Sequence, residues 1–210
     1  MREQVLIPVL LLGGFTIFFV VIVRLAAITS RKAAENVRRL AERLRLQMTE
    51  KKPVLGFHRS PEATGMIRGK RVRIYNYTTG SSKSQTTWSA VSVAPAGPVG
   101  LTFALSHQGL GTKLLEVFGA KEIKVGDKAF DRDWFIQTNK PDFFGAALLP
   151  EIQQKIQANK GTWKLADGLV VYSERGSFTN VQRSERFESV VDVACDLADI
   201  AEVHAQQTPN

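Results

Sequence analysis

The sequence predicts an α+β protein: an N-terminal transmembrane helix and a basic amphipathic helix, then one domain with a mainly antiparallel sheet and a long C-terminal helix. Three observations lead to this prediction. Residues 5–23 contain no charged side chain, residues 24–73 hold 14 Lys and Arg against 4 Asp and Glu, and the chain after them carries grouped strand-like segments interrupted by helix-like ones. Grouped strands with helices between the groups are typical of an α+β domain with an antiparallel sheet.

The first element is the apolar run over residues 5–23, which follows a short N-terminus of residues 1–4. As a helix, 19 residues extend about 28 Å, close to the hydrocarbon thickness of a bilayer. A cleaved signal peptide and a buried core helix are the alternatives. A signal peptide has a shorter apolar core and small residues after it, whereas Arg24 and Leu25 follow this run. We therefore expect a retained single-pass helix.

Basic residues on the two sides of this run predict its orientation. Only Arg2 precedes it, whereas six Lys and Arg fall within the twenty residues that follow. The positive-inside rule then places the C-terminal bulk of the chain in the cytoplasm. The single cysteine, Cys195, agrees, because one thiol cannot form the internal disulfides common in secreted domains.

The second element is a basic amphipathic helix within residues 24–53. It is expected to begin at Ser30 as N-cap and to run to Met48, before a short linker ending at Pro53. Three uses of its apolar stripe are open: lying on the membrane, packing on the domain, or forming a short coiled coil, for which two heptads are few. The stripe consists of Ala33, Val37, Leu40, Ala41, Leu44 and Met48.

The basic residues of this segment suggest anionic lipid headgroups as a partner, at about 1 kcal/mol per residue near the surface. Nucleic acid is disfavoured because residues 24–52 contain no stacking aromatic side chain. The alternative is that these charges only set the topology. The candidate lipid contacts are Arg24, Arg31, Lys32, Arg38, Arg39, Arg43 and Arg45.

The third part is one α+β domain over residues 54–205, followed by a polar tail over 206–210. Runs rich in β-branched and aromatic residues predict strands, Asp167-Gly168 predicts a hairpin turn, and helical spacing of apolar residues predicts the long last helix. The expected strands are 72–77, 86–93, 101–106, 134–137, 163–165 and 169–172. The expected helices are 112–118, one starting at 139–142, 150–158 and 184–205.

Candidates for chemistry are few, and the sequence predicts no catalytic, cofactor or metal site. Asp127, Asp131 and Asp133 form an acidic segment, but its glycine precedes the acids, unlike a calcium loop. The last helix carries a row of acids that predicts an opposing partner, with the basic segment as the nearest candidate and a solvated face as the alternative. The row is Glu185, Glu188, Asp192, Asp196, Asp199 and Glu202.

A short pattern resembles a known group of proteins. Gly126-Asp127, Phe130-Asp131 and Phe135, followed by Leu148-Leu149-Pro150, are similar to a segment of uncharacterised bacterial membrane-anchored proteins, matched over roughly residues 120–172. The resemblance implies a bacterial membrane protein of unassigned activity and transfers no catalytic residue.

Two functions from different classes follow. The first is a non-enzymatic binding or scaffolding module, held on the cytoplasmic face of a bacterial inner membrane, that binds a protein partner or anionic lipid. The second is a membrane-tethered hydrolase that uses Asp127, Asp131 or Asp133 with His58 or His107. It requires a carboxylate and an imidazole within hydrogen-bond reach of one another.

Overall fold

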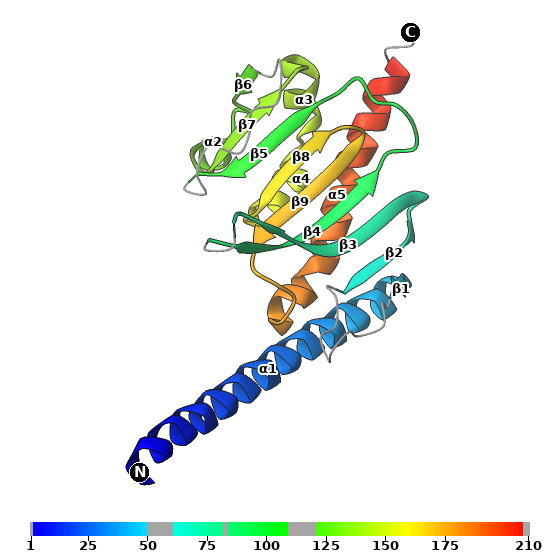
Figure 1. Cartoon of the computed structure of the whole chain (residues 1–210). Helices are drawn as coiled ribbons and strands as arrows, with labels where there is room; N and C mark the ends of the chain where they lie inside the picture. Colours follow the sequence, from blue (N-terminus) through cyan, green and yellow to red (C-terminus); the bar gives the residue numbers. More distant parts are fainter. Residues whose placement is uncertain (1, 50–60, 82–83, 109–120, 208–210) are drawn as a thin grey trace.

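One antiparallel sheet of nine strands organises the chain. The structure, a computed structural model, describes residues 2–49, 61–81, 84–108 and 121–207, and within the first helix it describes side chains at Phe15 and from Phe18 onward. The strands are β1 (Gln47–Thr49), β2 (Glu62–Ile67), β3 (Lys70–Thr79), β4 (Thr86–Ala94), β5 (Phe103–His107), β6 (Lys121–Ile123), β7 (Trp134–Thr138), β8 (Thr162–Ala166) and β9 (Leu169–Arg175). Their order across the sheet is β1-β2-β3-β4-β9-β8-β5-β7-β6 (Figure 1). The α+β class with an antiparallel sheet is confirmed.

Two hairpins agree with their sequence signals. β3 and β4 pair in a continuous register from Arg71 opposite Ala94 to Thr79 opposite Thr86. β8 and β9 are joined by Asp167 and Gly168, with φ of 54° and 71°. Positive φ at both positions is the type I′ geometry that suits the twist of a two-residue hairpin.

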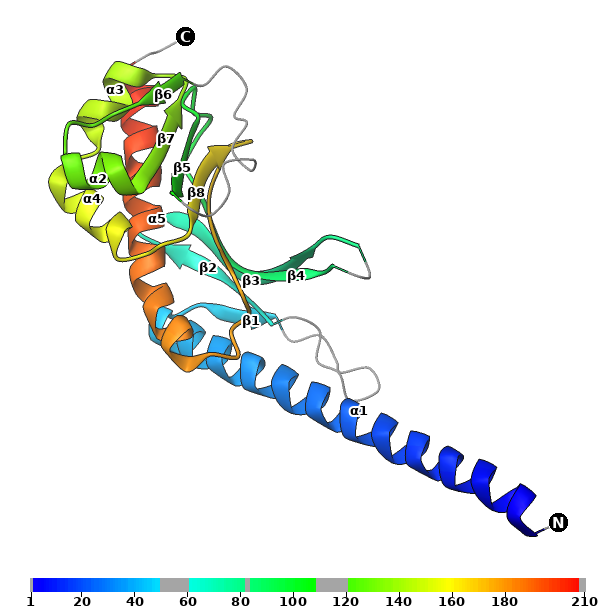
Figure 2. The same ribbon diagram turned by 90° about the vertical axis from the view of Figure 1, so that its left-hand side faces the viewer.

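The helices gather on one face of the sheet. They are α1 (Arg2–Leu44), α2 (Lys128–Asp133), α3 (Pro141–Ala147), α4 (Pro150–Gln157) and α5 (Val181–Gln207). Figure 2 shows α5 running along this face with α3 and α4 beside it, whereas no described helix covers the opposite face. Phe187, Val190, Ala194, Leu197 and Ala201 of α5 are buried, as their helical spacing predicts.

Residues 5–23 do not form a helix of their own, and the prediction of a transmembrane helix is wrong for the described part of the chain. There, no helix combines the length and the apolar window that crossing a membrane requires. The run instead belongs to α1, 43 residues long, which continues through the basic segment. The physical reason for one helix is that residues 24–44 contain neither Gly nor Pro to end it. Single-pass topology is therefore not retained.

The expected ends of the basic helix are also corrected. Ser30 is no N-cap; it lies inside α1, where its hydroxyl donates to the carbonyl of Ala27 at 3.0 Å. The helix ends at Leu44, before Met48, because Arg45 adopts a φ of 55° and the N–H of Leu46 donates to Ala41 O at 2.8 Å. This left-handed residue reverses the chain, so that Leu46 is buried and β1 pairs with β2.

Strands β2 and β6 and helix α2 lie where no element was expected, and β1 begins where the basic helix was expected to end. Strands β1 and β6 are three residues long, and β2 contains a glycine, so the sequence offers little strand signal there. The expected helix over 112–118 and the linker up to Pro53 fall outside the described residues, apart from Thr49 in β1.

Candidate functional site

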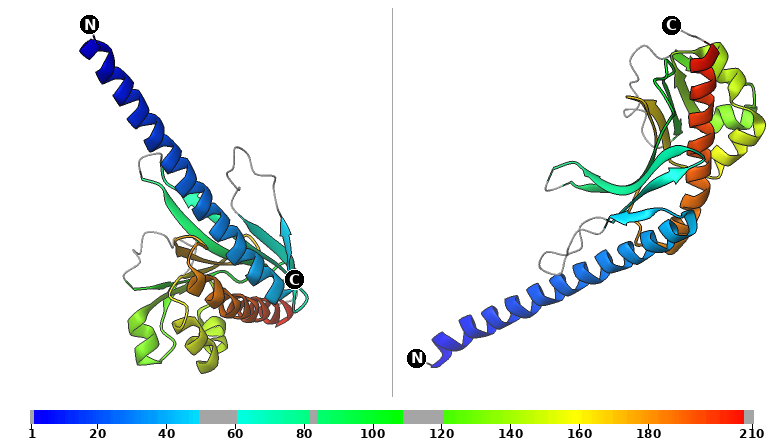
Figure 3. Two further views of the ribbon diagram at one scale, coloured as in Figure 1. Left: turned by 90° about the horizontal axis from the view of Figure 1, so that it is seen from below. Right: turned by 90° about the vertical axis from the view of Figure 1, so that its right-hand side faces the viewer.

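The N-terminal half of α1 stands away from the domain (Figure 3). Large apolar side chains from Phe15 onward are exposed on this helix. Isolated apolar residues are common on protein surfaces, but a continuous apolar surface marks a site of interaction. The exposed fractions range from 47% at Ile22 to 69% at Phe15. The exposed large apolar residues of α1 are Phe15, Phe18, Phe19, Val20, Val21, Ile22, Leu25 and Ile28.

The C-terminal half of α1 is part of the core of the domain. Ala33, Val37, Leu40 and Ala41 are buried, so the apolar stripe packs on the domain. Asn36, 3% exposed, donates to the carbonyl of Phe178 at 2.6 Å. The hydroxyl of Ser184 on α5 donates to Asn36 O at 3.0 Å. These bonds hold α1 to α5 and to the loop before α5, and they fix the direction in which the free half of α1 leaves the domain.

All seven candidate lipid-contact residues are exposed on α1 or directly after it. They are Arg24, Arg31, Lys32, Arg38, Arg39, Arg43 and Arg45.

Some of these cations are already engaged. Arg43 pairs with Glu188 at 2.8 Å, and Arg39 donates to Asn36. Arg24, Arg31 and Lys32, which lie nearest the apolar surface, have no ion-pair partner among the described residues. The free charges therefore adjoin the exposed apolar half of the helix.

The acidic row of α5 finds its partners mainly outside the basic segment. Lys155 of α4 lies 2.7 Å from Asp192 and 2.8 Å from Asp196, and these bonds raise the pKa of Lys155. Arg68, in the β2–β3 turn, pairs with Asp192, Asp196 and Asp199. Arg43 with Glu188, at 2.8 Å, is one pair between the basic segment and this row. Through these ion pairs, the acidic row attaches α5 to α4 and to the β2–β3 hairpin.

A second charged cluster lies in the interior. Glu174 of β9 is 9% exposed and accepts a hydrogen bond from the hydroxyl of Tyr172 at 2.7 Å. Arg183 and Arg186 of α5 both pair with its carboxylate. Burial, together with the charge of Glu174, raises the pKa of Tyr172 well above its usual range. The cluster attaches the start of α5 to the sheet.

The acidic segment before β7 serves local structure. Asp127 caps α2 by accepting from the N–H groups of Ala129 and Phe130 at 2.9 and 2.8 Å. Asp131 accepts from the N–H groups of Val125 and Gly126 at 2.8 and 3.0 Å.

Of the remaining members of the hydrolase set, Asp133 and His107 lie near one another: the pKa of Asp133 is lowered mainly by Arg132 and further by the charge of His107, but the hydrogen bond that the function requires does not join them. Asp133 is paired with Arg132 at 2.8 Å, and His107 lies against the Gln108 carbonyl at 2.8 Å. His58 falls outside the described residues. No described carboxylate of the segment is hydrogen-bonded to His107. In the part of the chain that the structure describes, no cluster of His, Cys, Asp and Glu could hold a metal ion.

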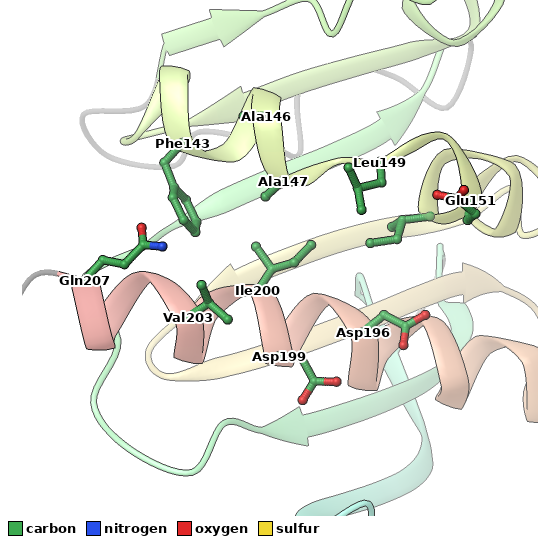
Figure 4. A pocket seen from close by; sticks show the side chains of 11 residues that line it. Phe143, Ala146, Ala147, Leu149, Glu151, Asp196, Asp199, Ile200, Val203 and Gln207 are labelled. Atoms are coloured by element: carbon green, nitrogen blue, oxygen red, sulfur yellow. The ribbon is translucent and has the colours of Figure 1, made fainter.

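Among the hollows lined by described residues, two have the size of a small-molecule site. One is an apolar groove of about 620 Å³ between α5 and the α3–α4 segment, into which Phe143, Leu149, Ile200 and Val203 point (Figure 4). Asp196 and Asp199 at its edge are neutralised by the cations described above. This groove can bury an apolar group, but its lining residues include no cation for an anionic one.

The other hollow is a cleft of about 470 Å³ on the sheet face that no described helix covers. It lies between the β3–β4 hairpin and the β8–β9 hairpin, and its lining combines aromatic, aliphatic and hydroxyl side chains with one lysine, Lys164. Sequence patterns missed this cleft. Part of the cleft could be predicted if the register of the β3–β4 hairpin were known, because that register makes Tyr77 and Trp88 cross-strand partners.

Comparison with known proteins places the fold but shows no family. No protein-family model matches the sequence, and no curated protein matches it. The structure is similar to the crystal structure of the mycobacterial trehalose monomycolate transport factor A. The similarity has a TM-score of 0.53 at 10% sequence identity and covers 81% of this chain and 94% of that chain. At this identity the likeness is one of fold. The motif resemblance over residues 120–172 stays a prediction.

Proposed function

We propose that this protein is a non-enzymatic binding module of a transport process and that α1 attaches it to an anionic lipid surface. The observation that carries the proposal is the free half of α1, with eight large apolar side chains exposed between Phe15 and Ile28. A helix of this kind gains free energy by burying its apolar surface among lipid chains, and adjacent cations add attraction to anionic headgroups.

The position of the free cations supports this interpretation. Arg24 lies within the last part of the exposed apolar stretch, and Arg31 and Lys32 lie between it and the docked half of the helix. There they can reach headgroups while the apolar side chains enter the lipid. The engaged cations, such as Arg43 with Glu188, lie on the docked half.

The transport setting is supported by fold likeness alone. The similar solved structure is described as a transport factor. Its name does not describe an enzyme, and here Asp127 and Asp131 are engaged by backbone N–H groups. A binding module that holds a partner or cargo at a lipid surface accommodates both observations.

Co-flotation of the full chain with lipid vesicles tests the attachment. Vesicles of phosphatidylcholine are compared with vesicles that contain phosphatidylglycerol, at 0.1 M salt. We expect stronger binding to the anionic vesicles, and at least about 100-fold weaker binding for the triple variant Arg24→Glu, Arg31→Glu, Lys32→Glu, since the loss of each cation removes about 1 kcal/mol and the added Glu is repelled by the headgroups.

The control is the triple variant Lys121→Glu, Lys124→Glu, Lys128→Glu, which makes the same change in net charge on exposed residues around β6. It should bind like the unmodified chain. Equal binding by both triple variants, or no preference for anionic vesicles, would overturn the proposal.

A further inference from the structure

The floor of the cleft on the uncovered face of the sheet is formed by strands β8 and β9. One set of their side chains is buried in the core: Trp163, Leu165, Val170 and Tyr172. Because successive side chains of a strand point to opposite faces, the residues between them face the cleft. The cleft floor consists of these alternate residues: Thr162, Lys164, Ala166, Leu169, Val171 and Ser173.

One wall of the cleft is aromatic. Tyr77 and Trp88 are direct partners in the β3–β4 register, with ring centroids 6.2 Å apart and planes within 11° of parallel. The indole N–H of Trp88 donates to Thr79 Oγ1 at 2.8 Å, which orients the ring. The β3–β4 hairpin curves away from the rest of the sheet (Figure 2), so this wall stands beside the floor.

The floor presents three polar groups: the hydroxyls of Thr162 and Ser173 and the ammonium of Lys164. Thr162 and Ser173 are direct partners in the β8–β9 register, and Lys164 lies two residues along on the same side. Within the described ranges, neither the hydroxyls nor the ammonium has a hydrogen-bond or ion-pair partner. Cross-strand partners lie about 5 Å apart, so one small anionic group can reach all three.

The rest of the lining suits an apolar group of a ligand. Next to the ammonium of Lys164 lies an apolar and aromatic surface, formed by Leu169, Val171, Trp88 and Tyr77. A cleft of about 470 Å³ has the size of a small-molecule site, in which an apolar lining carries a few placed polar groups. Asp167 at the hairpin tip disfavours a second negative charge at that end.

We infer that this cleft binds a small amphipathic anion, with its head on Lys164 and the hydroxyls of Thr162 and Ser173, and its apolar body against Tyr77, Trp88 and Val171. The head can be the carboxylate of a fatty acid or the phosphate of a lipid. The inference does not depend on the attachment of α1 to a lipid surface, because the cleft is formed by the sheet alone.

The test is isothermal titration calorimetry of the full chain with three twelve-carbon probes below their micelle concentrations: dodecanoate, dodecyl phosphate and uncharged dodecyl maltoside. We expect saturable binding, one molecule per chain, of at least one anionic probe, and weaker binding of the neutral one. The stronger anionic probe identifies the head group. Binding of the neutral probe as tight as that of both anions would overturn the inference.

Single-residue variants test whether the probe binds in this cleft. Lys164→Met keeps the aliphatic stem and should weaken binding of the preferred anion about tenfold while leaving the neutral probe unchanged, because a charge-assisted bond contributes about 1.5 kcal/mol. Trp88→Ala should weaken both. Lys164→Gln is the second variant if Lys164→Met does not fold.

The controls are Lys121→Met, away from the cleft, and Leu149→Ser, in the groove of Figure 4. Both should bind like the unmodified chain. Loss of binding with Leu149→Ser, together with normal binding by the Lys164 and Trp88 variants, would assign the ligand to the other hollow and overturn the inference.

Discussion

The ammonium of Lys70 on β3 lies 2.7 Å from a carboxylate oxygen of Glu202 on α5 and 2.7 Å from one of Asp199. Lys70 is 5% exposed, so a charged side chain lies between the sheet and the helix that covers it. Burial alone would lower the pKa of Lys70, but its bonds to the two carboxylates outweigh burial and raise it. The ion pairs thus make burial of this lysine tolerable.

Replacing Lys70 by Met should lower the free energy of unfolding by about 1–2 kcal/mol, because Glu202 loses its ion-pair partner and Asp199 keeps only Arg68, while both carboxylates stay partly accessible to water. Urea denaturation measures the loss. Lys121→Met, at an exposed position of β6, should change stability by less than about 0.5 kcal/mol. Equal stability of the two variants would contradict a structural role for the Lys70 pairs.

Gly161 is expected to tolerate no side chain. A Cβ there would overlap the ring of Tyr172, whose hydroxyl is bound to Glu174 and which therefore cannot move aside. Gly161→Ala should destabilise the protein by about 1–3 kcal/mol. Gly97→Ala is the matched control, since a Cβ at Gly97 would meet no atom within 4 Å. Thermal unfolding of both variants checks this, and a normal melting temperature for Gly161→Ala would refute it.

Cys195 should be unreactive in the folded protein. It is fully buried on α5, and burial raises the pKa of its thiol to about 11, with the nearby Arg68 opposing the rise. Since the thiolate is the reactive form, Ellman's reagent at pH 8 should label the native chain at least about 100-fold more slowly than a free cysteine. In 6 M guanidinium one thiol per chain should react at once. Rapid labelling of the native protein would show that α5 is not packed as described.

His204 should make the protein less stable in mild acid. Burial, and secondarily the charge of Lys140, lowers the pKa of His204 below the ordinary value of 6.5. The unfolded chain therefore binds the proton first, so stability is complete above pH 6.5 and falls as the pH drops toward the lowered pKa of the folded state. Urea denaturation between pH 7.5 and 5 should show this slope.

The variant His204→Leu should lose that part of the slope. Addition of 0.5 M salt should leave most of it in the unmodified chain, because burial is the larger cause and salt screens only the effect of Lys140. A slope that His204→Leu retains in full would assign it to other groups.

Much of the local structure could be predicted from the sequence because its causes are local. The alternation over 72–77 and 86–93, the Asp167-Gly168 turn and the helical spacing of 184–205 each depend on neighbouring residues. They appear as β3, β4, the β8–β9 hairpin and α5. The short strands β1 and β6 give no such signal, and they exist because a longer partner strand pairs with them.

The packing of the basic segment could not be predicted from the sequence. The apolar stripe follows from residue spacing, but whether it contacts a membrane, another helix of a coiled coil or the domain depends on the surface opposite it. In the fold that surface includes α5, where Ser184 is hydrogen-bonded to Asn36. The same holds for the acidic row: charge predicted a partner, and only the fold selected Lys155, Arg68 and Lys70.

The α+β class, the main hairpins, the long last helix and the uneven distribution of charge all follow from the order of residues along the chain. Three features arise only in the folded molecule: one helix joins residues 2–44, the helices cover a single face of the sheet, and Tyr77, Trp88 and Lys164 line one cleft. Backbone propensity and side-chain periodicity act over a few residues and can be read along the chain. Strand order and ion-pair choice join residues far apart in sequence, so they follow only when the whole core packs.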